Sequence, residues 1–484
     1  MNTVQRIAKN MVVLFIARIA SMLFGFFYVM YTARYLGPAN YGILSFALAL
    51  SGIFGVIANF GLDPLTVREV ARDKILARKY LANGIVLKLI FGSLTFLIVF
   101  SVVNLLGYPE VTRKVVYIIT LSTIIAGISN LFNDIYQAFE RMEFMSIGQA
   151  LQSMLSLVFA ITAIKLGLNV VHFAMIYLIV NLIVLGYHVV ITTWKFLKPK
   201  IEVDLSFWKS VVREAWPFAL SSIFVSIYFW VDSVMLSYMK GDEVVGIYNA
   251  AYRLVYTLLF IPGIYFTTIY PLLSRMYLES KEGLKFAYNR SLKYFTVLGV
   301  FIGVATVLFS REVILLIYGK AYEASIPALK ILIWAVVFSF MAHSTLYTLN
   351  SINKQIVYTK ATALGAILNF VLNIFAIQKW SYIGASITTV ITEALGFFIM
   401  FAYLKLYFKE SLTSYRWIVK LALIVLGSVG VYYLTLEISH NLVVLLLVYT
   451  LGYGLGTLLF KIVDSTDFNL LKKALRGGGE IEVP

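Results

Sequence analysis

The chain has 484 residues, of which 61% are apolar and only 13% are charged. Soluble globular proteins are about 45–50% apolar and about 25% charged, so this composition indicates an integral membrane protein and excludes a large soluble catalytic domain. The net charge of +16 is better explained by basic cytoplasmic loops beside anionic lipids than by nucleic-acid binding. Cysteine is absent from the sequence, which excludes disulfides, thiolate nucleophiles and cysteine metal sites.

Apolar runs of span length, bounded by charged residues or by Gly and Pro, predict fourteen transmembrane helices. The first run follows Arg6 and Lys9 and is too long for the core of a signal peptide, so we interpret it as an uncleaved span. The predicted helices cover residues 10–33, 41–60, 82–104, 115–138, 144–164, 170–193, 215–239, 246–270, 294–309, 326–350, 358–377, 382–404, 418–435 and 442–460.

The distribution of basic residues predicts the topology. With the N-terminus inside, most of the 40 Lys and Arg residues fall in cytoplasmic segments, as the positive-inside rule requires. Both termini are then cytoplasmic, and we expect a multi-pass protein of the cell membrane. The predicted external loops are short, which argues against a sugar-polymerising or ligating enzyme.

Two six-helix halves repeat each other. The corresponding pairs are Gly37 and Gly241, Gly42 and Gly246, Pro64 and Pro271, Leu65 and Leu272, Arg68 and Arg275, and Lys74 and Lys281. Because six helices is an even number, both copies enter the membrane from the same side and the repeat is parallel. The predicted fold is therefore all-α, with an N-terminal six-helix bundle (1–200) and a C-terminal six-helix bundle (201–410) around a central cavity. Residues 411–484 add two transmembrane helices and a cytoplasmic tail.

Motifs in both halves resemble a known family. They are ARYLGP at 33–38 with YG at 41–42, GLDP at 61–64 with Arg68 and Glu69, and Asp232 with GIYNAAY at 246–252. These resemble the signatures of polysaccharide and O-antigen flippases, which are related to lipid II flippases and to multidrug and toxin extrusion antiporters. The resemblance covers residues 1 to about 410. It implies that a lipid-diphosphate-linked oligosaccharide moves from the cytoplasmic to the outer leaflet of the membrane.

Basic residues inside predicted spans are the candidate substrate-binding groups. A charged residue costs at least about 2.5–3.5 kcal/mol at the centre of a span, so Arg18, Arg253 and Lys88 are functional candidates. A guanidinium fork suits a diphosphate, and Tyr28 and Asn249 lie on the same helix faces as the two arginines. The alternative is that these bases pair with intramembrane acids or extend to the membrane surface.

Oxygen-bearing side chains share one depth band in the second half. Asp232, Asn369, Asn373 and Thr389 are the set, and one carboxylate with neutral oxygens suits a hard monovalent cation. Lipid II flippases carry a similar sodium site on the same three helices, although the relatives have a second acid where this chain has Asn373. The alternative is that the asparagines form interhelical hydrogen bonds only. Glu393 and Asp134 are candidate coupling residues, and the coupling ion is either Na⁺ or H⁺. Alternatively, Glu393 joins the cation site or pairs with a base, and Asp134 is a solvated or paired carboxylate.

The leading hypothesis is an ion-coupled, alternating-access flippase for cell-surface glycan assembly. The alternative is a cation-coupled multidrug antiporter of the same fold, against which the arginines of the first and eighth spans argue. We do not expect an enzyme, and no Walker-type phosphate loop is present in the sequence. The expected partners are the lipid-linked oligosaccharide and membrane lipids, without nucleic acid, and we expect a monomer.

Overall fold

A computed structural model describes residues 3–198, 202–409, 415–464 and 467, but not the side chains of residues 3–18, 415 and 416. All secondary structure in these residues is helical. The α-helices are α1 (Thr3–Asn59), α2 (Leu62–Arg72), α3 (Ala77–Leu105), α4 (Glu110–Ala138), α5 (Met142–Lys165), α6 (Val170–Lys195), α7 (Leu205–Lys240), α8 (Asp242–Thr257), α9 (Phe260–Glu279), α10 (Lys281–Leu308), α11 (Ser310–Ile317), α12 (Ser325–Ser351), α13 (Gln355–Phe408), α14 (Tyr415–Ile438) and α15 (Leu442–Leu459). Two short 3₁₀ helices, η1 (Lys74–Leu76) and η2 (Lys320–Tyr322), lie between them.

The predicted all-helical membrane fold with fourteen spans is confirmed. Among the described residues, 12 helical stretches are long and apolar enough to cross a membrane. Two of them contain a break, α1 at Gly37 and α13 at Ser381, and each of these two helices corresponds to two predicted spans. The predicted span 246–270 is interrupted after Thr257, and Pro262 lies in the first turn of α9, where its missing N–H costs no helical hydrogen bond.

Equivalent glycines of the repeat have the same backbone conformation. Gly37 has φ 68° and ψ 173°, and Gly241 has φ 91° and ψ 169°. Residues with a Cβ atom rarely adopt this conformation, so glycine is needed at both positions. Each glycine ends one helix and directs the chain into the next, which begins at Pro38 in the first half and Asp242 in the second.

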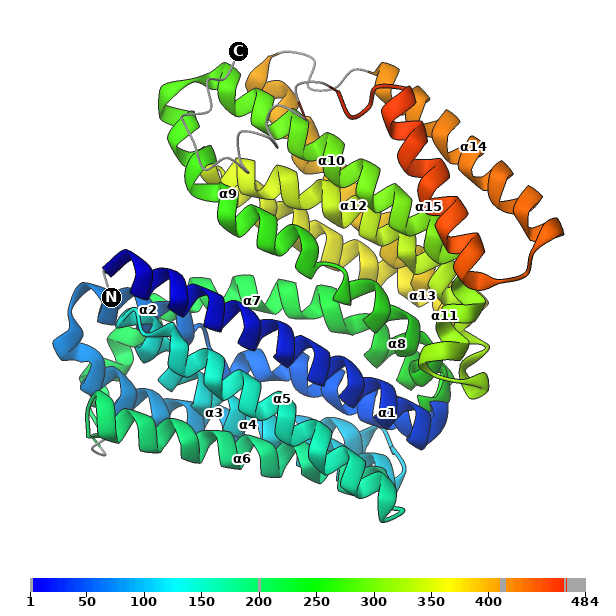
Figure 1. Cartoon of the computed structure of the whole chain (residues 1–484). Coiled ribbons are helices and arrows are strands. Elements are labelled where there is room, and N and C mark those ends of the chain that lie inside the picture. Colours follow the sequence, from blue (N-terminus) through cyan, green and yellow to red (C-terminus); the bar gives the residue numbers. More distant parts are fainter. Residues whose placement is uncertain (1–2, 199–201, 410–414, 465–466, 468–484) are drawn as a thin grey trace. The chain divides into compact units, whose positions relative to one another are not determined.

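The helices form two compact units. The first unit comprises Met1–Ala250, Ile314–Ser325 and Asn369–Ala385. Within it α1 packs against α3, α4, α5 and α7, and α4 packs against α6 (Figure 1). A core of Leu81, Leu131, Ile135 and Tyr136 joins α3 to α4. Because α7 packs against α1 and α2, this unit extends beyond the predicted N-terminal bundle 1–200, whose boundaries stay a prediction.

The second unit comprises Ala251–Val313, Ile326–Leu368 and Ser386–Pro484. In this unit α14 and α15 lie side by side (Figure 1). They are joined to α10 by Tyr449 and Tyr453, whose hydroxyls donate to backbone carbonyls of α10 at 3.0 and 2.8 Å. Beyond α15, Asp467 accepts from Arg290 at 2.6 Å and Lys293 at 2.9 Å. The predicted helix pair is therefore attached to the second half of the repeat, while the tail after Asp467 lies outside the described residues.

Candidate functional site

A buried polar network surrounds Asp232 in the first compact unit. Asp232 on α7 is 3% exposed, and its Oδ1 accepts from Asn373 Nδ2 at 2.6 Å. Asn373 Nδ2 also donates to Asn369 Oδ1 at 3.0 Å, one turn earlier on α13. The structure therefore brings together three of the four predicted cation ligands. The fourth, Thr389, is buried and belongs to the second compact unit.

Tyr248 belongs to the same network. Its hydroxyl donates to Asp232 Oδ2 at 2.7 Å, and its side chain is fully buried. Tyr248 is the third residue of the GIYNAAY motif and was not predicted as a site residue. A tyrosine 16 positions after a buried acid, across a helix break, was the available signal.

The side-chain oxygens of Asp232, Asn369 and Asn373 suit a monovalent cation. Asn373 Oδ1 is buried and has no hydrogen-bond partner among the residues that the structure describes. An amide oxygen left in this condition costs about 1–3 kcal/mol unless a ligand or water binds to it. Together with the carboxylate of Asp232 and the amide of Asn369, it supplies the oxygen ligands that such ions prefer.

Asn249 lies beside the network on α8. Its Nδ2 donates to Ser233 Oγ at 2.9 Å and to the carbonyl of Val245 at 3.0 Å. The side chain is 3% exposed, so in this conformation Asn249 helps to join α8 to α7. Its predicted contact with substrate requires a conformation in which this buried face becomes accessible.

The other predicted substrate residues are divided between the two units. Tyr28 on α1 is buried, and its ring packs edge-on against Tyr177 with centroids 5.7 Å apart. Arg253 on α8 is half-buried and belongs to the second unit. The side chain of Arg18 lies outside the described residues, although its backbone is part of α1.

Glu393 is at the centre of a second polar cluster, within the second compact unit. Its Oε1 accepts from the Tyr256 hydroxyl at 3.1 Å, and its Oε2 accepts from Ser339 Oγ at 2.7 Å. Tyr256 lies one helical turn after Arg253 on α8. The cluster therefore connects α8, α12 and α13 through an intramembrane carboxylate, which is the class of residue expected in ion coupling.

Lys88 is the centre of a third buried cluster, in the first unit. The side chain is 1% exposed, and its ammonium donates to Asp63 Oδ1 at 2.5 Å, Asn59 Oδ1 at 2.9 Å and the carbonyl of Gly127 at 2.7 Å. These three bonds use every N–H of the lysine. Asp134, which is 7% exposed, lies within electrostatic range of Asp63 and Lys88. The predicted substrate residue Lys88 and the predicted coupling residue Asp134 therefore share one cluster.

The comparisons with known proteins identify the family. The profile of the family described as "Polysaccharide biosynthesis protein" matches residues 7–277, which is more than half of the chain. The chain belongs to this family. A second profile, MatE, matches residues 217–375.

Curated relatives and solved structures agree with this membership. A putative O-antigen transporter of Shigella dysenteriae is 25% identical over 402 residues, covering 80% of this chain and 97% of the relative. A probable low-salt glycan biosynthesis flippase, Agl15, of Haloferax volcanii is 24% identical over 402 residues, covering 81% of this chain and 82% of the relative. The structure of the lipid II flippase MurJ in an inward closed conformation superposes with a TM-score of 0.74 at 16% sequence identity, covering 93% of this chain and 98% of that structure.

This membership confirms the resemblance to the flippase family that the motifs indicated. In its fold, this polysaccharide biosynthesis family protein is similar to MurJ and to transporters of the multidrug and toxin extrusion family. Its intramembrane carboxylates are therefore interpreted below as groups for transport.

Proposed function

We propose that this polysaccharide biosynthesis family protein is an alternating-access flippase that moves a lipid-diphosphate-linked oligosaccharide from the cytoplasmic to the outer leaflet. The observation that supports this most is that the O-antigen transporter and the glycan flippase both align with about four-fifths of the chain. The short predicted external loops agree with transport of a finished oligosaccharide rather than with its polymerisation.

In this proposal Arg18 and Arg253 bind the diphosphate. A diphosphate accepts bidentate hydrogen bonds from guanidinium groups, which remain charged at every physiological pH. Tyr28 and Asn249 would contact the substrate from the same helices. Lys88 would act from within its buried cluster, through the residues that it orients.

The direct test is reconstitution in lipid vesicles. Outward movement of a short-chain lipid-diphosphate oligosaccharide is measured for wild type, Arg18→Ala, Arg253→Ala and the corresponding Lys variants. We expect the Ala variants to lose most of the transport at normal expression, and the Lys variants to recover only part of it, because lysine lacks the planar fork. Full activity in the double Ala variant would remove these arginines from the mechanism.

The cation that drives transport is proposed to be sodium, bound at Asp232, Asn369, Asn373 and Thr389. A ligand that binds only the folded protein stabilises it by RT ln(1 + [L]/Kd). Sodium should therefore raise the melting temperature more than choline does at equal ionic strength, and Asp232→Asn should abolish the difference. If wild type responds equally to the two ions, protons become the preferred coupling ion, and Glu393 and Asp134 become the residues to test by changing the pH gradient.

The same reconstituted protein tests the alternative of a cation-coupled multidrug antiporter. The match of the MatE profile to residues 217–375 is the observation that favours it. Efflux of a cationic fluorescent dye against a sodium or proton gradient, with no movement of the lipid-linked oligosaccharide, would establish the antiporter and reject the flippase.

A further inference from the structure

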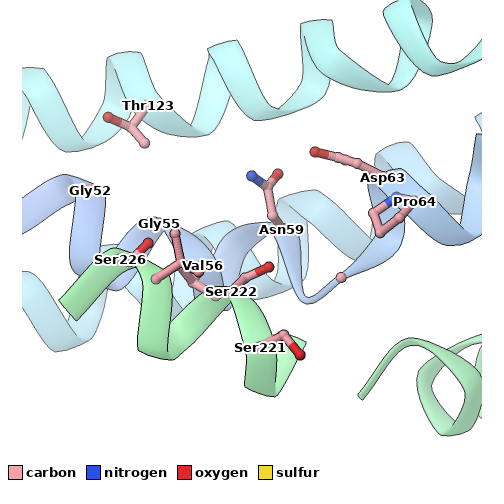
Figure 2. A pocket seen from close by; sticks show the side chains of 12 residues that line it. Gly52, Gly55, Val56, Asn59, Asp63, Pro64, Thr123, Ser221, Ser222 and Ser226 are labelled. Carbon is pink, nitrogen blue, oxygen red and sulfur yellow. The ribbon is translucent and has the colours of Figure 1, made fainter. Parts of the chain in front are cut away.

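A cavity lies inside the first compact unit, separate from the Asp232 network. It has a volume of about 440 Å³ and is lined by the second half of α1, the start of α2, α4 and α7. This volume is within the range of roughly 300–1,000 Å³ that small-molecule sites occupy. Figure 2 shows that Asn59, Asp63 and Thr123 come from one side and that Ser221, Ser222 and Ser226 come from α7.

The wall of this cavity carries several side chains that can hydrogen-bond to hydroxyls. Ser222 and Ser226 make no hydrogen bond with other described residues, so their hydroxyls are available to a ligand. The Asn59 amide nitrogen is also without a partner in the described part of the chain, because only its Oδ1 is bonded. The rest of the wall is formed by Gly52, Gly55, Val56, Gly61, Pro64 and Val225.

Lys88 fixes the polar part of the wall from behind. It holds Asn59 by Oδ1 and Asp63 by Oδ1, and its third bond to the Gly127 carbonyl anchors it to α4. Because the Asn59 Oδ1 is bonded to Lys88, the amide nitrogen is the atom that Asn59 offers to a ligand in the cavity. A carboxylate accepts about four hydrogen bonds, so Asp63 retains acceptor capacity while Lys88 neutralises its charge.

A fixed amide donor beside a neutralised carboxylate matches a sugar ring. Adjacent hydroxyls on a ring each donate one hydrogen bond and accept others, so one can donate to a carboxylate while its neighbour accepts from an amide. The serine hydroxyls can both donate and accept. A diphosphate does not suit this wall, because the lysine charge is already paired and Asp63 would repel an anion.

We infer that this cavity is a saccharide subsite, which holds one sugar unit of the transported glycan while the diphosphate is bound elsewhere. The inference rests on the proposed flippase function. Lys88 is then a positioning residue, which explains how a fully buried base can influence substrate binding without touching the substrate.

The test compares two ligands that differ only in the sugar. Binding of a short-chain lipid diphosphate with and without its oligosaccharide is measured for wild type, Ser222→Leu, Ser226→Val and Ser210→Leu. The leucine at 222 fills part of the cavity, and the valine at 226 removes a hydroxyl at nearly constant shape. Ser210 is an exposed serine of α7 outside the cavity and serves as the matched control.

We expect Ser222→Leu to weaken binding of the glycosylated ligand about tenfold, which corresponds to the loss of one or two hydrogen bonds. Ser226→Val should weaken it about threefold. Neither should change the binding of the sugar-free ligand, and Ser210→Leu should change nothing. Equal losses for both ligands, or no loss for the glycosylated one, would overturn the subsite.

A second measurement separates this inference from the proposed function. Ligand-observed NMR with a panel of free hexoses, N-acetylhexosamines and uronic acids reports saccharide binding without any lipid. If wild type binds a free sugar and Ser222→Leu does not, the subsite stands even where the lipid-linked ligand fails to bind and the flippase proposal falls. If the lipid-linked ligand is transported but neither serine variant affects it, the flippase stands and the subsite falls.

Discussion

A close approach of two backbones in the first compact unit predicts a large effect of one methyl group. A Cβ atom added at Gly42 on α1 would lie 1.6 Å from the backbone oxygen of Asp242 and 2.9 Å from the nitrogen of Gly246. Since real Cβ contacts are essentially never shorter than 3.0 Å, the two helices would have to separate by about 1.4 Å. The obstructing atoms are backbone, so no side-chain rotation can relieve the overlap.

Gly42→Ala should therefore lower the free energy of unfolding by about 3 kcal/mol, the upper end of the usual cost of overpacking. Gly246→Ala should cost a similar amount, because its Cβ would lie 2.0 Å from the backbone oxygen of Pro38. Thermal melting in detergent is the assay. Gly25→Ala is the matched control, since a methyl there meets nothing within 4 Å and should be neutral or stabilise α1 by roughly 0.5–1 kcal/mol.

The double variant provides the sharper result. Once the helices have separated to accommodate the first methyl group, the second needs little further movement. The loss of unfolding free energy in the double variant should therefore be much smaller than the sum of the two single losses. If Gly42→Ala and Gly246→Ala melted like Gly25→Ala, the two backbones would not be in the close contact described above. Fully additive losses would show that each methyl acts through a different contact.

Three further predictions follow from the ion pairs and the topology. Lys88→Met should lower stability by about 3–5 kcal/mol because it leaves Asp63 without its partner, and Lys88→Met with Asp63→Leu should recover part of the loss in the same melting assay. The hydrogen bond from Lys79 is the main cause that lowers the pKa of Asp204, and those from Ser206 and the Phe207 N–H add to it. The ionised carboxylate therefore stabilises the folded protein above about pH 4, and this stabilisation is lost as the pH falls through the lowered pKa. The melting difference between wild type and Asp204→Asn should accordingly shrink below about pH 4, and a constant difference would contradict the assignment. A tag at the C-terminus should be cytoplasmic and a label in the 438–441 loop should be external, whereas an external C-terminus would mean that the predicted topology contains a miscounted span.

The sequence predicted the helices because lipid imposes a length and an apolarity that are readable residue by residue. The break at Gly37 was readable for a similar reason, since Gly followed by Pro ends one helix and begins another. The break at Ser381 lies between the predicted spans 358–377 and 382–404, but the residue itself could not be predicted, because serine with φ 52° has no local signal and depends on the surrounding contacts. Intervals between predicted spans supplied its position only approximately.

The predicted sites divide in the same way. Asp232, Asn369 and Asn373 were placed together because depth in the membrane can be counted along each helix. Their hydrogen bonds could not be predicted, since the rotation of each helix about its axis is set by packing. Tyr248 was missed for that reason, and so was the pairing of Lys88 with Asp63, which lies 25 residues earlier on another helix.

The repeat explains why this close contact joins these particular positions. Gly42 approaches the backbone of Asp242, and Gly246 approaches the backbone of Pro38. Gly42 and Gly246 are equivalent positions of the two halves, and so are Pro38 and Asp242. The contact is therefore made by two copies of one motif against each other, as in a twofold interface where residue i meets j and j meets i. Only backbone atoms and the absence of Cβ atoms are required. The side chains at 38 and 242 are consequently free to differ, and they do, while glycine is kept at both 42 and 246. Glycine is therefore required at positions 42 and 246 of the repeated motif, whereas the residues that contact these glycines through backbone atoms can differ between the two copies.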